Sequence, residues 1–170
     1  GYWVTKNGVQ PQMKKVDSIL EMTEPNNKKQ LRGFIGLINY YRDMWRRRSH
    51  VLAPLTSLTS KKVPWKWKHE QSRSFKEAKR IIAKNAILAF PDFSKKFTIY
   101  TDASKYQLGG VITQEGRPLA FYSRKLKNAQ TRYTTTEREL LSIVETLKEF
   151  RTILLGHEIE VFTDHKNLTF

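Results

Sequence analysis

Two short segments of this 170-residue chain alternate apolar and polar residues and end in the same Thr-Asp dipeptide. They are residues 97–102 and 159–164, and Glu139 lies near the start of an amphipathic run between them. Alternation with a period of two predicts β-strands, whereas the run between them has a helical period. The chain is therefore constrained to an α/β arrangement in which acidic residues end two strands and begin a helix.

The composition allows a packed globule and excludes several classes of protein. Hydrophobic residues make up 39% of the chain, which is enough for one domain with a core, or for a small domain plus an added lobe. Cysteine is absent, so disulfides and thiolate metal sites are excluded. No apolar run approaches the roughly 20 residues of a membrane span, and no signal peptide is visible. We expect no membrane partner.

Positive charge is concentrated in the first half of the chain. Residues 1–91 contain 19 Lys and Arg against 6 Asp and Glu, whereas residues 92–170 contain 12 against 10. An excess of basic residues can be a solubilising surface, but a one-sided excess fits better with binding to phosphate groups.

The first half is predicted to be mainly helical. The Asn7-Gly8 dipeptide is a hairpin signal after an apolar segment. A short helix is expected over 16–22, and a longer one begins after Asn26 or Asn27, either of which can cap it. Arg46, Arg47 and Arg48 are expected to close that helix. An apolar segment over 52–58 is expected to be broken by Pro54, and another helix to run over 70–88.

The second half is predicted to be a mixed α/β domain of order β-β-β-α-β. Strands are expected over 97–102, 109–113, 119–123 and 158–164, with a turn at Glu115-Gly116. A helix is expected over 136–154, with Leu140, Ile143, Val144 and Leu147 facing inward. Charge and periodicity both change at Pro91-Asp92. The predicted divisions are 1–15, 16–91 and 92–170.

Three acidic residues are candidates for a metal site. Mg²⁺ prefers oxygen ligands, and two ions about 4 Å apart can activate a water and stabilise a leaving oxygen in phosphodiester hydrolysis. Asp102, Glu139 and Asp164 meet that requirement only if the two strands that end in Thr-Asp are neighbours, which spacing alone does not establish.

Several motifs resemble one family in the order in which they occur. Residues 100–104 (Tyr-Thr-Asp-Ala-Ser), 122–126 (Tyr-Ser-Arg-Lys-Leu), 133–141 (Tyr-Thr-Thr-Thr-Glu-Arg-Glu-Leu-Leu) and 163–165 (Thr-Asp-His) are similar to the ribonuclease H region of gypsy-type LTR-retrotransposon reverse transcriptases. Residues 31–41 (Leu-Arg-Gly-Phe-Ile-Gly-Leu-Ile-Asn-Tyr-Tyr), Ala53-Pro-Leu55 and Pro91-Asp92 resemble the stretch that joins the polymerase palm, through the thumb, to that region. Residues 1–5 resemble the last palm strand.

The resemblance implies a ribonuclease H-like mixed sheet, incomplete at its C-terminal side, preceded by a mainly α-helical, thumb-like lobe. It implies cleavage of RNA in RNA–DNA hybrids with Mg²⁺ or Mn²⁺. Asp102, Glu139 and Asp164 would be catalytic residues and metal ligands, with Glu139 rather than Glu137 on the helix position. A fourth carboxylate would lie beyond Phe170.

The resemblance also bears on the polymerase reaction and on partners. No Asp-Asp pair occurs in the chain, so the polymerase reaction is not expected of it. The remainder of the Pol polyprotein is an expected partner. The location is expected to be cytoplasmic, with the nucleus as the alternative.

Each candidate ligand also has a structural interpretation. Asp102 could be a turn residue, since Thr-Asp-Ala-Ser is typical of turns. Glu139 could instead complete a capping box with Thr136. Asp164 could cap a strand end.

The nucleic-acid-binding candidates also have structural alternatives. They are Arg46, Arg47, Arg48, Lys61, Lys62, Lys66, Lys68 and Ser104. The three arginines could be a solvated helix end, and Ser104 could simply end a turn. Trp65 and Trp67 could stack on bases or be buried between the two lobes. The alternative to an enzyme is a non-catalytic nucleic-acid-binding module or a scaffold.

Overall fold

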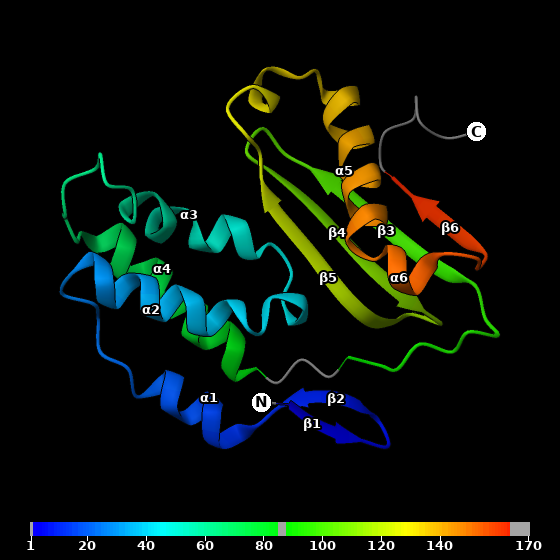
Figure 1. Cartoon of the computed structure of the whole chain (residues 1–170), viewed down its shortest axis with the longest axis horizontal. Coiled ribbons are helices and arrows are strands. Elements are labelled where there is room, and N and C mark those ends of the chain that lie inside the picture. Colours follow the sequence, from blue (N-terminus) through cyan, green and yellow to red (C-terminus); the bar gives the residue numbers. More distant parts are fainter. Residues whose placement is uncertain (1, 85–87, 164–170) are drawn as a thin grey trace.

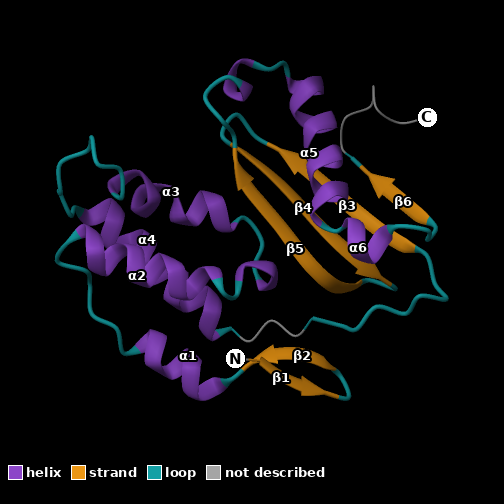
Figure 2. Cartoon of the chain, viewed as in Figure 1, coloured by secondary structure: helices purple, strands orange, loops and turns teal. Residues whose placement is uncertain are grey.

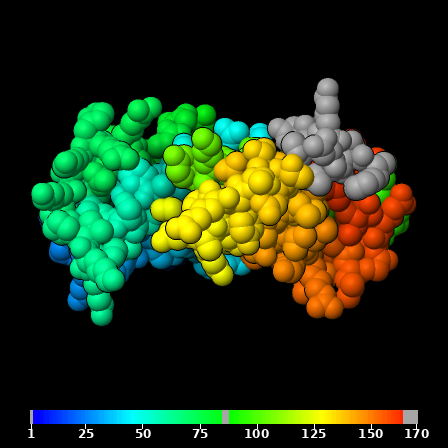
Figure 3. Space-filling model, turned by 90° about the horizontal axis from the view of Figure 1, so that it is seen from above, coloured from blue at the N-terminus to red at the C-terminus, as the bar shows by residue number. Residues whose placement is uncertain are grey.

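The computed structural model describes residues 2–84 and 88–163. A helical lobe lies at one end of the molecule, and a sheet covered by a long helix lies at the other (Figure 1, Figure 2). Figure 3 shows the elongated shape that results, with the helical lobe and the last strand at opposite ends. No helix within the described residues is long and apolar enough to cross a membrane.

The chain begins with the expected hairpin. Strands β1 (Tyr2–Thr5) and β2 (Gly8–Pro11) pair antiparallel, with Thr5 opposite Gly8. Gly8 has a φ of 135°, a backbone conformation that residues other than glycine rarely adopt. The prediction from Asn7-Gly8 is confirmed.

Helix α1 (Met13–Leu20) is followed by α2 (Lys28–Asn39), and Asn27 rather than Asn26 caps α2. The Asn27 side chain accepts a hydrogen bond of 2.9 Å from the backbone N–H of Gln30. The prediction that Arg46, Arg47 and Arg48 close this helix is wrong. A short 3₁₀ turn, η1 (Arg42–Met44), follows α2, and Arg47 adopts a left-handed φ of 55° before the next helix begins.

Helix α3 (Arg48–Leu58) runs through Pro54, so the predicted break is wrong. Burial of Leu52, Leu55 and Leu58 offsets the hydrogen bond that Pro54 cannot make. Helix α4 (His69–Ala83) ends before residue 88, where its end was expected. Leu88 instead forms a β-bridge with Val9 of the first hairpin.

The sheet confirms the predicted α/β class. Its strands are β3 (Phe97–Ala103), β4 (Gln107–Gln114), β5 (Arg117–Lys125) and β6 (Ile159–Phe162). Their order is β5-β4-β3-β6, with β3, β4 and β5 antiparallel and β6 parallel to β3. Glu115 and Gly116, with φ of 51° and 76°, form the predicted turn between β4 and β5.

Helix α5 (Thr135–Glu149) lies across β3 and β4, and a short helix, α6 (Arg151–Leu154), follows it (Figure 1). The predicted inward face of α5 is wrong in part, because Leu140 is 50% exposed. The buried positions are polar, and the Ser142 hydroxyl donates to the backbone carbonyls of Asp102 (3.1 Å) and Gly109 (2.9 Å). Gly110 leaves room for Thr146, which is fully buried.

Two hydrophobic clusters form the cores of the two lobes. The first includes Phe34 and Phe75, and the second includes Phe97 and Ile112. Trp65 and Trp67 stack on each other and pack against the first cluster, so they are not buried between the lobes. The predicted divisions at 15/16 and 91/92 stay predictions.

Candidate active site and nucleic-acid interface

The end of strand β3 carries the first predicted acidic residue. Parallel pairing sets Phe97 opposite Ile159 and Tyr100 opposite Phe162, so β3 and β6 are neighbours, as the predicted metal site requires. Asp102 is the second-last residue of β3 and lies opposite Gly109. It is therefore a strand residue rather than a turn residue. Asp164 lies outside the described residues.

The β3–β4 turn is held by Ser104. Its hydroxyl oxygen accepts hydrogen bonds from the backbone N–H groups of Tyr106 (3.2 Å) and Gln107 (3.1 Å). Of the two roles considered for Ser104, the structure therefore contains the turn-ending one.

The helix start separates two glutamates that the sequence left ambiguous. Thr134 and Glu137 form the capping box: the Glu137 carboxylate accepts the Thr134 N–H at 2.7 Å, and the Thr134 hydroxyl accepts the Glu137 N–H at 3.2 Å. The hydrogen bonds that the Thr134 backbone N–H and hydroxyl donate to the Glu137 carboxylate lower the pKa of Glu137. The capping role considered for Glu139 is therefore wrong, and so is the partner Thr136.

Glu139 instead points at the end of β3. It is only 3% exposed, and its Oε1 accepts the backbone N–H of Ala103 at 3.1 Å. Ala103 directly follows Asp102, so the structure brings the Glu139 carboxylate to the strand end on which Asp102 lies.

The Asp102 carboxylate faces the helical lobe. Its Oδ2 lies 3.3 Å from a guanidinium nitrogen of Arg47, and the two side chains are 46% and 59% exposed. A pair this exposed contributes about 0.2–1 kcal/mol. The contact nevertheless shows that a positive group is accommodated beside Asp102.

The donor chemistry at this strand end fits Mg²⁺ or Mn²⁺. Asp102 and Glu139 offer carboxylate oxygens only, which hard divalent cations prefer, and a cationic side chain already lies against one of them. Over residues 2–84 and 88–163, no three His, Asp or Glu side chains converge on one point. The third predicted ligand, Asp164, is outside that range.

The basic candidates form two groups rather than one. Arg46 and Arg47 are exposed just before α3, beside the sheet. The four lysines lie in the α3–α4 connection, at the end of α3 away from the sheet (Figure 1), and all are exposed: Lys61, Lys62, Lys66 and Lys68. Because α3 has 11 residues, it is about 16 Å long and separates the two groups by roughly that distance.

Arg48 joins the lobes. Its guanidinium donates to the Asn39 side chain and to the Ser123 backbone carbonyl, both at 3.2 Å. Partial burial, with Arg42 nearby, lowers the pKa of Arg48. Arg48 is thus partly buried and hydrogen-bonded within the protein, unlike the exposed Arg46 and Arg47.

Sequence reasoning missed the polar contacts between the lobes. Ser49 donates through its backbone N–H to the Ser123 hydroxyl (3.0 Å) and through its own hydroxyl to Gln107 (2.9 Å). Arg42 pairs with Glu149 at 3.1 Å. No local pattern signals these residues, because each contact joins positions more than 50 residues apart.

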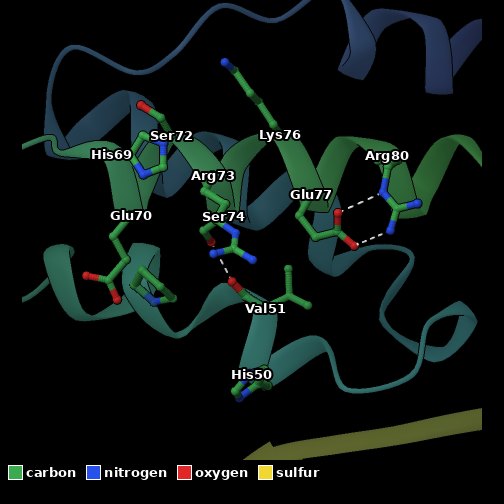
Figure 4. Close-up of a pocket in the computed structure, with 11 residues that line it drawn as sticks. His50, Val51, His69, Glu70, Ser72, Arg73, Ser74, Lys76, Glu77 and Arg80 are labelled. Atoms are coloured by element: carbon green, nitrogen blue, oxygen red, sulfur yellow. Dashed lines mark hydrogen bonds and ion pairs between the residues drawn. The ribbon is translucent and has the colours of Figure 1, made fainter.

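A hollow of about 830 Å³ between α3 and α4 was also missed. Figure 4 shows Glu77 paired with Arg80 along one side, while Lys76 points away from His50 and Val51. The hollow lies wholly in the helical lobe and is lined by none of the predicted site residues.

The comparisons with known proteins agree with this fold. Residues 67–161 match the family described as "RNase H-like domain found in reverse transcriptase", and the chain belongs to that family. It is 38% identical, over its whole length, to the retrovirus-related Pol polyprotein from transposon gypsy of Drosophila melanogaster. It is 34% identical over 99% of its length to the transposon Tf2-3 polyprotein of Schizosaccharomyces pombe. The predicted resemblance to gypsy-type Pol polyproteins is confirmed.

The chain spans only 18% and 13% of those two relatives. Among solved structures, it is similar to a foamy viral protease-reverse transcriptase in complex with dsDNA (TM-score 0.86, 25% identity). That match covers 98% of this chain and 36% of the other. The same viral protein in complex with RNA/DNA hybrid also has a TM-score of 0.86 at 25% identity, over 96% of this chain and 23% of that one.

Proposed function

We propose that this chain supplies the ribonuclease H activity of a retroelement Pol polyprotein, hydrolysing the RNA strand of RNA–DNA hybrids. The observation that carries the proposal is the contact between the Glu139 carboxylate and the Ala103 N–H, directly beside Asp102. This contact places the buried Glu139 carboxylate of α5 at the end of β3, which already carries Asp102.

The proposed metal ligands are Asp102, Glu139 and Asp164, and the proposed ions are Mg²⁺ or Mn²⁺. When bound, such ions supply an activated water and stabilise the leaving 3′ oxygen. The role of the chain is to aim its carboxylates. The Ala103 N–H fixes one oxygen of Glu139, and Ser142 ties α5 to the backbone at Asp102.

The proposed partner is an RNA–DNA hybrid or another duplex, held by its phosphates without sequence preference. Support comes from the net positive charge of residues 1–91 and from the exposure of Arg46, Arg47 and the four lysines of the α3–α4 connection. The foamy viral relatives in complex with dsDNA and RNA/DNA hybrid also support this partner. Two basic groups about 16 Å apart suit contact at two points of one duplex.

The test is cleavage of a labelled RNA–DNA hybrid in Mg²⁺ by the unaltered protein, Asp102→Asn and Asp17→Asn. Asp17 is an exposed residue of α1 and serves as a control for the same chemical change. We expect Asp102→Asn to abolish cleavage and Asp17→Asn to leave it unchanged. Equal cleavage by all three proteins would remove the role assigned to Asp102.

The second candidate is a binding module without catalysis. The observation that favours it is the ion pair between Arg47 and Asp102, which commits the carboxylate to another partner. Such a module would bind the hybrid in EDTA with a steep dependence on salt. A scaffold would show no binding even at low salt.

A further inference from the structure

Arg47 belongs to the helical lobe, yet its guanidinium contacts the candidate catalytic carboxylate on the sheet. The residue lies 55 positions before Asp102 in the chain and 3.3 Å from it in space. Its φ of 55° is a left-handed conformation, which non-glycine residues adopt rarely. Backbone conformations of this kind persist where the surrounding structure imposes them.

The residues that follow Arg47 fix its position. Arg48 donates to the Ser123 carbonyl, and Ser49 donates to Ser123 and Gln107, so the start of α3 is fastened to β4 and β5. Arg47 directly precedes these hydrogen-bonded residues, and their contacts with the sheet place it at the end of β3.

The depression beside the pair is too small for a nucleotide. A depression of about 50 Å³ is bounded by Arg46, Arg47, Asp102 and Gly109, among others. That volume holds one or a few waters, and its charged lining is two guanidinium groups against one carboxylate, so it favours the approach of a phosphate oxygen to Arg47 rather than a cation.

A metal ion at Asp102 and the Arg47 guanidinium compete for the same oxygens. Inner-sphere coordination by Mg²⁺ or Mn²⁺ requires carboxylate oxygens at close range. A guanidinium also forms strong, charge-assisted hydrogen bonds with phosphate groups. A phosphate that reaches Arg47 therefore offers it a partner other than Asp102.

We propose that Arg47 is a positioning residue that occupies Asp102 until nucleic-acid phosphate draws it away, so that the helical lobe couples hybrid binding to metal loading. The inference rests on the proposed function, because it takes Asp102 as a metal ligand. By linkage, phosphate bound to Arg47 strengthens metal binding at Asp102, and a metal bound to Asp102 strengthens phosphate binding at Arg47 by the same factor.

The first test measures Mn²⁺ affinity from the electron paramagnetic resonance signal of free Mn²⁺. Arg47→Asn removes the guanidinium and keeps a residue that tolerates a left-handed backbone. Arg46→Asn removes the same charge one position away and is the matched control. Since the pair is exposed, we expect Arg47→Asn to bind Mn²⁺ about two- to five-fold more tightly than Arg46→Asn. Equal affinities of the two variants would overturn the proposal.

The second test needs no metal. In EDTA, the affinity for a fluorescent RNA–DNA hybrid is measured for Asp102→Asn, Arg47→Asn and the double variant. We expect the Asp102→Asn change to strengthen hybrid binding more when Arg47 is present than when Arg47→Asn has already been made. Only the protein that keeps Arg47 has a guanidinium that the loss of Asp102 can release. Additive effects would contradict the coupling.

Different results would refute the metal-ligand role of Asp102 and the positioning role of Arg47. If Asp102→Asn binds Mn²⁺ as tightly as the unaltered protein, Asp102 is not a ligand and the proposed function fails. If Asp102→Asn loses Mn²⁺ while Arg47→Asn and Arg46→Asn bind it equally, only the role of Arg47 fails. Circular dichroism of each variant checks that it is folded.

Discussion

Replacing Gly110 with alanine tests the contact that sets α5 on the sheet and so positions Glu139. A Cβ at Gly110 would lie 2.5 Å from Oγ1 and 2.7 Å from Cγ2 of Thr146. Thr146 is fully buried and β-branched, so its side chain has little freedom to rotate away. Overpacking of this kind destabilises by about 1–3 kcal/mol.

The expected result is a lower melting temperature. For a chain of this length, 1 kcal/mol corresponds to about 2–4 °C, so Gly110→Ala should lower the midpoint by roughly 2–12 °C. Thermal unfolding followed by circular dichroism measures it. Combining Gly110→Ala with Thr146→Ala removes both close atoms and should restore most of the loss.

The adjacent glycine is the control. A Cβ at Gly109 would meet only the Asp102 carbonyl oxygen, at an ordinary 3.6 Å. Gly109→Ala should therefore change the stability by no more than about 0.5 kcal/mol. If Gly110→Ala is as stable as Gly109→Ala, the packing of α5 described here is incorrect.

Three further changes have defined outcomes. Gly33→Ala in α2 adds a methyl group with nothing within 4 Å and should raise the unfolding free energy by about 0.5–1 kcal/mol in a denaturant titration. Trp67→Phe removes the Nε1–H that donates to Glu24 (2.7 Å) and Ser72 (2.9 Å), and should lower that free energy by at least about 1–2 kcal/mol. Hydrogen bonds from Thr134 hold the pKa of Glu137 below its ordinary 4.5, so its stabilising effect is full above that value and is lost as the pH falls through the lowered pKa. The melting temperatures of the unaltered protein and Glu137→Gln should therefore differ at neutral pH and converge in acid; a constant difference down to pH ~2 would contradict this.

Local signals predicted the elements that local chemistry decides. Asn7-Gly8 predicted the first hairpin, and Glu115-Gly116 predicted the turn between β4 and β5, because both need backbone conformations that few residues allow. The alternating residues before Asp102 predicted β3.

Features that depend on tertiary contacts were not predictable. The periodicity of α5 placed Leu140 inward, whereas Ser142 and Thr146 face the sheet because Gly110 leaves a gap and two backbone carbonyls accept hydrogen bonds. Pro54 indicated a break that burial of its neighbours in α3 overrides.

The candidate site was predictable in part. The pattern around Asp102 and Glu139 indicated that they belong together, and the structure brings Glu139 to the N–H of Ala103. The pairing of Arg47 with Asp102 joins two lobes and carries no sequence signal. The role of Glu137 in the capping box became clear only from the position of the helix start.

The most direct test of the metal site is anomalous diffraction from crystals of the protein grown with Mn²⁺. We predict an anomalous peak for a Mn²⁺ ion that the carboxylates of both Asp102 and Glu139 coordinate, with the Arg47 guanidinium displaced from Asp102. Manganese bound only at other residues, with Arg47 still on Asp102, would contradict a catalytic centre at the end of β3.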